Sequence, residues 1–141
     1  MKITKDYPGL TRAKNGDYIL KGDLVSEEGI DIELDARLVV TGSIKAGRSI
    51  EAERSIEAGW GIKAGWGITA GWGITAGDGI VSGWGIKAGT YIDCGKRIFA
   101  GTSVLADADN CDKTIQCAEL RNGTVAYGDL VITKQEETNE D

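Results

Sequence analysis

Histidine is absent from this sequence of 141 residues, and proline occurs only once, at Pro8. The lack of histidine removes the commonest general base and zinc ligand, so we expect no catalytic residue, no metal site and no cofactor. With so little proline, the 21 glycines do not belong to a disordered linker. They recur in register with isoleucines, which indicates one ordered domain.

Long hydrophobic runs are also missing. No apolar stretch approaches the roughly 20 residues needed to cross a bilayer. The start, MKITKDYPGL, lacks the apolar region of a signal peptide. The three cysteines, Cys94, Cys111 and Cys117, fit a reducing compartment. We therefore expect a cytoplasmic protein that does not bind membranes.

The sequence has no excess of positive charge. It has 16 Lys and Arg against 22 Asp and Glu, a net charge of −6. Direct binding to nucleic acid needs a basic face to neutralise phosphates, so we expect none. An acidic protein suits a protein partner with a basic surface. The acidic residues concentrate in residues 1–43 and 104–141, whereas the middle is slightly basic.

The middle of the chain is a six-residue repeat. From Ile44 it reads IKAGRS, IEAERS, IEAGWG, IKAGWG, ITAGWG, ITAGDG, IVSGWG, IKAGTY, IDCGKR, IFAGTS and VLADAD. The first position is isoleucine from Ile44 to Ile98 and then Val104, and the third position is always small. A helix would scatter a period of six around its surface, whereas a strand puts positions one and three on one side.

Each hexad therefore predicts one short strand followed by a corner. We expect glycine at position four to supply the unusual backbone angles of a tight corner. Three hexads close a coil of about 18 residues, and successive coils stack at about 4.8 Å. The predicted fold is an all-β, single-domain parallel β-helix with triangular coils, and right-handed winding is favoured over left-handed.

Residues 18 apart should stack in columns at the corners. The predicted columns are Arg48, Trp66 and Trp84; Arg54, Trp72 and Thr90; and Trp60, Asp78 and Lys96. Because Arg, Asp and Lys share position five with tryptophan, this position is expected to face solvent. The alternative, in which the indoles fold back over the corners as packing, fits the sequence equally well.

The boundaries follow from weaker strand signals outside the hexads. We expect a lead-in at 1–16, a solenoid domain at 17–132 with regular hexads at 44–109, and an acidic disordered tail at 133–141. The segment Gly-Asp-Leu-Val occurs at 22–25 and again at 128–131, near both ends of the predicted solenoid.

Past Val104 the repeat slips by one residue. Cys94 and Ile98 find counterparts 17 positions later in Cys111 and Ile115, which predicts one slightly short coil. Cys94 and Cys111 would then lie in neighbouring coils, within disulfide reach. We favour small buried free thiols that fill the core.

Other chemical sites have little support. No cysteine pair has the CxxC spacing of a zinc site, and no phosphate-binding glycine motif occurs. Residues 107–112 offer spaced oxygen ligands but lack the glycine and distal glutamate of a calcium loop. We expect an exposed acidic corner there.

Residues 20–47, LKGDLVSEEGIDIELDARLVVTGSIKAG, resemble a bactofilin in the G-D-L-V-S-E-E stretch and the V-x-G-x-I-x-A rhythm. That resemblance implies a right-handed β-helix and a structural polymer that assembles end to end. The unit GWGIKAGWGI resembles small solenoid proteins of phages and mobile elements. The hexads are also similar to hexapeptide-repeat β-helices, but the enzymes of that group work through histidine and place the small residue before the aliphatic one.

Three functions remain open. The first is an inhibitor from a mobile element, of the anti-CRISPR or DNA-mimic kind, whose partner is a nucleic-acid-binding protein such as a CRISPR effector. The second is a bactofilin-like polymer, a homo-oligomer that assembles through the solenoid ends. The third is an ice- or glycan-binding solenoid that uses a face with Thr69 and Thr75 or the tryptophans. The candidate partner-binding residues are Trp60, Trp66, Trp72, Trp84, Glu27, Glu28, Asp31, Glu33, Asp35, Asp107, Asp109, Asp112 and Asp129.

Overall fold

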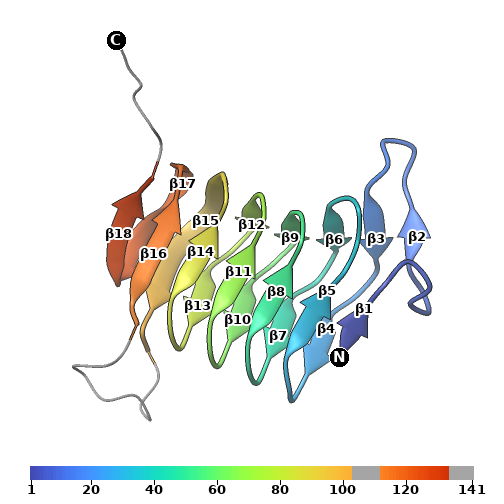
Figure 1. The fold of residues 1–141 in the computed structure, drawn as a ribbon, viewed down its shortest axis with the longest axis horizontal. Helices are drawn as coiled ribbons and strands as arrows, with labels where there is room; N and C mark the ends of the chain where they lie inside the picture. The colour runs from blue at the N-terminus through green and yellow to red at the C-terminus, as the bar shows by residue number, and fades with distance from the viewer. Residues whose placement is uncertain (103–111, 134–141) are drawn as a thin grey trace.

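The chain folds as a parallel β-solenoid of about six coils (Figure 1). The structure is a computed structural model that describes residues 1–102 and 112–133. Each regular coil of 18 residues contributes one short strand to each of three faces, so the predicted triangular parallel β-helix is confirmed.

Face A is the seven-stranded sheet of the solenoid. Its strands are, in spatial order, β1 (Lys2–Ile3), β5 (Ile30–Ile32), β8 (Ile50–Ala52), β11 (Ile68–Ala70), β14 (Ile86–Ala88), β16 (Thr114–Cys117) and β18 (Asp129–Ile132). All of its neighbouring strands are parallel.

The other two faces join through the long strand β15 (Tyr91–Ala100), which turns the corner between them. Face B holds β3 (Tyr18–Leu20), β6 (Leu38–Val40), β9 (Ile56–Ala58), β12 (Ile74–Ala76) and the first half of β15. Face C holds β4 (Leu24–Ser26), β7 (Ile44–Ala46), β10 (Ile62–Ala64), β13 (Ile80–Ser82) and the second half of β15. Strand β17 (Glu119–Tyr127) pairs with β15 along both halves.

The interior is built from the first and third positions of the hexads. All ten isoleucines from Ile44 to Ile98 are at most 1 % exposed, which confirms the predicted core. The small residues of position three lie beside them and are almost all buried, with Ser82 and Cys94 in the places that alanine takes elsewhere. Burial of each isoleucine contributes roughly 1.5–3 kcal/mol, so the columns are the main source of stability.

The position-four glycines have a different role from the predicted one. Among those that the structure describes, only Gly101 has a positive φ, 79°. A Cβ atom on Gly65 would instead overlap the carbonyl oxygen of Gly47, one coil away, and Gly77 stands in the same relation to Gly59. Glycine is needed at positions 65 and 77 because the stacked backbones there leave no room for a Cβ atom.

The expected short coil after Val104 is wrong. Ile115 pairs in register with Ile86 on face A, the place that the hexad register gives to Val104. The residue in register with Ile98 is Val125, not Ile115. The in-register residues Ile86 and Ile115 are 29 positions apart in the sequence, whereas a regular coil takes 18, so this coil is longer than the others and not shorter. Val104 and Cys111 lie outside the described residues, and Cys94 is a buried free thiol.

The two ends of the solenoid differ. At the N-terminal end, β1 pairs with β5, β2 (Thr11–Arg12) pairs antiparallel with β3, and Ile3 is completely buried. Tyr7 and Leu10 pack against the core there. At the other end, Leu130 and Ile132 occupy inward positions above Ile115 and Cys117, yet they are 41 % and 49 % exposed. The C-terminal coil is thus open, as far as the described residues go.

Candidate interaction surfaces

The position-five side chains form the predicted columns at all three corners. The backbone N–H of Trp84 donates to the carbonyl of Trp66, 3.1 Å away, and that of Trp66 donates to Arg48 at 3.4 Å. Equivalent bonds join Trp72 to Arg54. These ladders hold the corner residues of neighbouring coils at a fixed spacing, which makes the columns rigid.

The corner between faces C and A carries the most ordered column. The indoles of Trp66 and Trp84 are stacked, with centroids 5.1 Å apart and planes 6° apart. The guanidinium of Arg48 lies 5.4 Å from the centroid of Trp66. Both faces of Trp66 are therefore covered, and the rings present their edges to solvent.

The backbone of Trp66 is also held by a hydrogen bond from the interior of the solenoid. The buried hydroxyl of Ser82 donates its one hydrogen to the Trp66 carbonyl, 2.6 Å away, and the carbonyl of Gly85 lies 3.2 Å from the same oxygen. This short, buried hydrogen bond holds the Trp66 backbone in one geometry. The side chains of Trp66 and Trp84 are nevertheless 41 % and 40 % exposed, so of the two arrangements that the sequence allowed, the solvent-facing one is found. They lie outside the corner and do not cover the core.

The other two tryptophans lie on the other two corners. Trp72, between faces A and B, is 51 % exposed and has Arg54 4.7 Å from its centroid. Trp60, between faces B and C, is 65 % exposed, and its column continues to Asp78. The four tryptophans therefore do not form one surface.

The N-terminal carboxylates divide into paired and unpaired groups. Glu33 pairs with Lys2 at 3.5 Å, and Asp35 pairs with Arg12 at 3.6 Å. The remaining three, Glu27, Glu28 and Asp31, make no ion pair with any described residue. Glu28 stands in the column of Arg48, whose N–H donates to its carbonyl at 3.2 Å.

Asp35 is further held by Tyr18, whose hydroxyl donates to Asp35 Oδ1 at 2.8 Å. This hydrogen bond, assisted by the charge of Arg12, lowers the pKa of the Asp35 carboxyl. Asp35 is thus a structural carboxylate, engaged within the first coil. It is less suited to contact a partner than Glu27 or Glu28.

The C-terminal carboxylates lie at the opposite end of the molecule. Asp112 accepts a hydrogen bond from the Thr114 N–H at 3.0 Å and lies against Gly85, next to the corner of Trp84. Asp129 begins β18 and is exposed. Asp107 and Asp109 lie outside the described residues. Those predicted acidic residues that the structure describes are therefore grouped at two ends and do not form one continuous array.

The threonine face suggested by the sequence does not exist. Thr69 lies on face A, in register with Glu51 and Lys87, whereas Thr75 lies on face B between Glu57 and Asp93. Each threonine is flanked by charged residues, so neither face carries a regular hydroxyl array.

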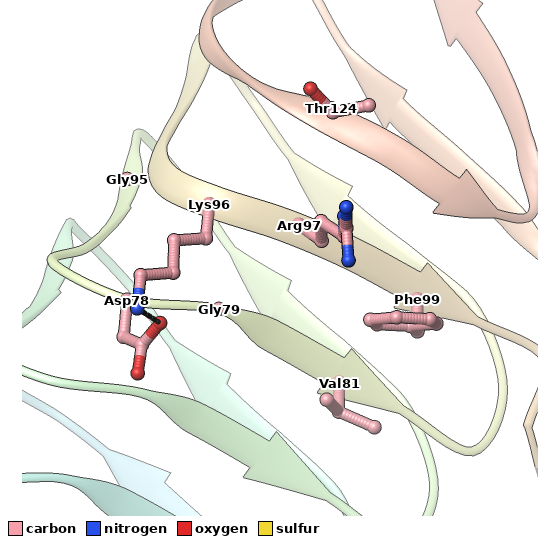
Figure 2. A pocket seen from close by; sticks show the side chains of 8 residues that line it. All are labelled: Asp78, Gly79, Val81, Gly95, Lys96, Arg97, Phe99 and Thr124. Carbon is pink, nitrogen blue, oxygen red and sulfur yellow. Dashed lines mark ion pairs between the residues drawn. The ribbon is translucent and has the colours of Figure 1, made fainter.

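A groove that was not predicted from the sequence opens on face C (Figure 2). It has a volume of about 560 Å³ and an apolar floor of Val81 and Phe99. Arg97 and Thr124 line one side, and Lys96 pairs with Asp78 at 3.5 Å on the other. Writing the position-two residues at a spacing of 18 would have revealed this side-chain column, because it also contains Lys45 and Lys63.

Residues 1–102 and 112–133 hold neither a metal site nor a membrane-spanning helix. No group of three or more Cys, Asp or Glu side chains could hold a metal ion there. Within the same residues, no helix has the length and apolar character needed to cross a membrane.

Sequence and structure comparisons give no relative for the chain. No family model matches it, and neither a curated protein nor a solved structure is similar enough to count as a match.

Proposed function

We propose that this protein is a non-enzymatic binding scaffold that contacts a protein partner through the corner between faces C and A. We call this corner the tryptophan ridge and define it as Glu27, Glu28, Arg48, Trp66 and Trp84. The observation that carries the proposal is the exposed, parallel stack of Trp66 and Trp84.

Leaving the apolar surface of these two indoles in water is unfavourable in free energy. Large aromatic side chains that stay exposed in an ordered stack are typical of contact surfaces. Tryptophan and arginine are enriched among the few residues that dominate binding energy, and a polar rim usually surrounds them. The stack is fixed before a partner arrives, so little conformational entropy is lost on binding.

The rim of the ridge favours a basic partner. Glu27 and Glu28 lie at its N-terminal end, and Asp112 lies beside Trp84 at the other. Together with the net charge of −6, these carboxylates favour a positively charged surface and oppose direct binding to nucleic acid. We propose that the partner is a nucleic-acid-binding protein, as for a phage or mobile-element inhibitor of the anti-CRISPR kind.

Competition for DNA tests this proposal. Purified CRISPR effector complexes and an unrelated basic DNA-binding protein would be titrated with the wild-type protein, and bound DNA would be measured by fluorescence anisotropy. We expect displacement of DNA from one effector. Trp66→Ala and Trp84→Ala should each weaken displacement by about 30-fold, the effect of losing roughly 2 kcal/mol at an interface centre.

Trp60→Ala is the matched control, because Trp60 is the most exposed tryptophan and lies on a different corner. It should compete as well as the wild type. Equal losses for all three variants, or no displacement by the wild-type protein, would overturn the proposal.

A second candidate function has one observation in its favour. The open C-terminal coil exposes the inward side chains Leu130 and Ile132, and the edges of β17 and β18 offer strands for pairing. A bactofilin-like polymer would need two open ends, whereas Ile3 and the β2–β3 pair cover the N-terminal end.

This asymmetry favours association of two C-terminal ends over a continuous filament. Sedimentation velocity and negative-stain microscopy distinguish the two. A dimer that Leu130→Lys converts to a monomer would support end-to-end pairing. Long filaments would instead show that the N-terminal cap opens.

A further inference from the structure

Face C carries an outward column of side chains that no other part of the described structure uses. Lys45 and Lys63 are in register on β7 and β10, and Val81 and Phe99 continue the column on β13 and β15. Arg97 lies beside Phe99, on the wall of the groove. We call these five residues the basic stripe.

The charges of the basic stripe lack internal partners. Lys45 and Lys63 are both exposed, and neither they nor Arg97 form an ion pair with any described residue. Strands β4, β7, β10 and β13 contain no acidic residue. Face C is therefore basic, although the chain as a whole is acidic.

The two lysines lie directly opposite each other on neighbouring strands, which lowers the stability of the fold. Neighbouring strands lie about 4.8 Å apart, and like charges directly opposite each other repel. No ion pair among the described residues offsets this repulsion. An anion bound from outside would remove the repulsion, which gives the site a preference for negative groups.

We infer that the basic stripe binds an extended acidic segment of a protein partner. The segment would place one carboxylate between Lys45 and Lys63, an apolar side chain in the groove over Val81 and Phe99, and a second carboxylate at Arg97. This inference does not rest on the proposed function, because the tryptophan ridge is formed by a different column.

The dimensions of the basic stripe fit such a segment. From Lys45 to Phe99 there are three coil steps, or about 14 Å at the usual strand spacing. An extended chain advances about 3.3 Å per residue and points alternate side chains to one side. Five residues in the order acidic, polar, apolar, polar, acidic have about this length, and their first, third and fifth side chains point to one side. The fifth would turn aside from the axis to reach Arg97, which lies two residues before Phe99 on the same strand.

Nucleic acid fits less well. Three unpaired cations would neutralise few phosphates, and the net charge of −6 repels a polyanion at long range. The apolar floor of the groove would also stay uncovered by a phosphate backbone. A peptide with two carboxylates and one leucine satisfies both the charges and the floor.

The probe is the peptide acetyl-Glu-Ser-Leu-Ser-Glu-amide, titrated into nitrogen-15-labelled full-length protein and followed by amide chemical shifts. We expect shifts at Lys45, Lys63, Val81, Arg97 and Phe99 that weaken when NaCl is raised from about 0.05 M to about 0.3 M. The same peptide with glutamine in place of both glutamates should produce no shifts at the basic stripe.

Two variants complete the test. Lys45→Gln with Lys63→Gln should lower the affinity about tenfold and should not lower the melting temperature, because the substitution relieves repulsion. Lys87→Gln on face A, also exposed, is the matched control and should bind as the wild type does. Equal binding of both peptides, shifts confined to other faces, or the same shifts with a thymidine oligonucleotide and none with the peptide would overturn the inference.

Discussion

The phenol ring of Tyr91 lies on the backbone of Gly73, in the space that a Cβ atom of residue 73 would need. Arg37 Nη2 donates to the Tyr91 hydroxyl at 3.4 Å, and the guanidinium of Arg121 lies 3.9 Å from the ring centroid. One tyrosine thus bridges coils that are far apart in sequence. A glycine at position six is what allows it to lie flat.

Gly73→Ala should displace this ring. We expect it to destabilise the protein by about 1–3 kcal/mol, as for other substitutions that overfill a packed site. In a Tyr91→Ala background the same change should cost less, because no ring occupies the space. Urea unfolding of the four proteins gives the coupling energy, which should be about 0.5–3 kcal/mol. Additive effects would show that the ring moves aside freely.

Gly65→Ala tests the close approach of stacked corners. Its Cβ would overlap the carbonyl oxygen of Gly47, and neither backbone can move without disturbing the ladder. We expect a loss of at least about 1–3 kcal/mol in the free energy of unfolding.

The control is Gly61→Ala, where the carbonyl oxygen of Gly79 would lie 3.3 Å from the added Cβ atom. Gly61→Ala should cost clearly less in the same urea titration. Equal losses in the free energy of unfolding for the two variants would show that glycine is required for backbone entropy and not because of the close contact with the neighbouring carbonyl.

Ile68→Asp should unfold the protein. Ile68 is completely buried between Ile50 and Ile86, so a carboxylate there has no partner or solvent. A cost above about 4–5 kcal/mol is expected, which is comparable to the stability of many domains. Thr69→Asp, on the exposed side of the same strand, should change stability by about 0.5 kcal/mol or less. If circular dichroism melts showed the same melting temperature for Ile68→Asp and Thr69→Asp, Ile68 would not be a core residue.

The hydrogen bond from Tyr18 to Asp35 predicts a dependence of stability on pH. Because it lowers the pKa of Asp35 in the folded state, its contribution is present above the unfolded value of about 3.9 and is lost as the pH falls through the folded pKa. The difference in free energy of unfolding between wild type and Tyr18→Phe should therefore shrink below about pH 4. Urea titrations at several pH values measure it, and a constant difference would contradict the prediction.

Burial raises the pKa of the Cys94 and Cys117 thiols. The reactive thiolate is therefore disfavoured at both positions. In a Cys111→Ser chain, we expect the remaining thiols to react with Ellman's reagent at least about 100-fold more slowly in the folded state than in urea. Rapid reaction of the folded chain would show that the core opens readily.

The sequence predicted the core and the corner columns because a strict period leaves few arrangements. Ten isoleucines six residues apart can share one interior only if the chain winds, and this winding places Trp84 above Trp66. The exposure of the tryptophans could not be predicted, since a corner can direct a side chain either way. In the structure, Ser82 donates a hydrogen bond to the Trp66 carbonyl while the indole ring stays outside the corner.

Three other features could not be predicted from the six-residue repeat, each for a physical reason. The glycines of position four have the same spacing whether they adopt a positive φ or allow the backbone of the next coil to approach closely. The spacing therefore does not distinguish the two roles. The register of Ile115 depends on how many residues a corner can absorb, which a hexad count does not limit. The contact of Tyr91 with Arg37 joins residues whose sequence separation is a multiple of the coil length, and it requires both side chains to extend along the axis.

Because coils of 18 residues stack in register, the length of the solenoid changes in steps of one coil. Residues 62–79 make up one complete coil of three hexads, so their removal or duplication would keep the remaining strands in register. Each such step would change the distance between the acidic N-terminal end and the open C-terminal end by about 4.8 Å. A rod of this kind can be fitted to partners of different size by whole-coil steps.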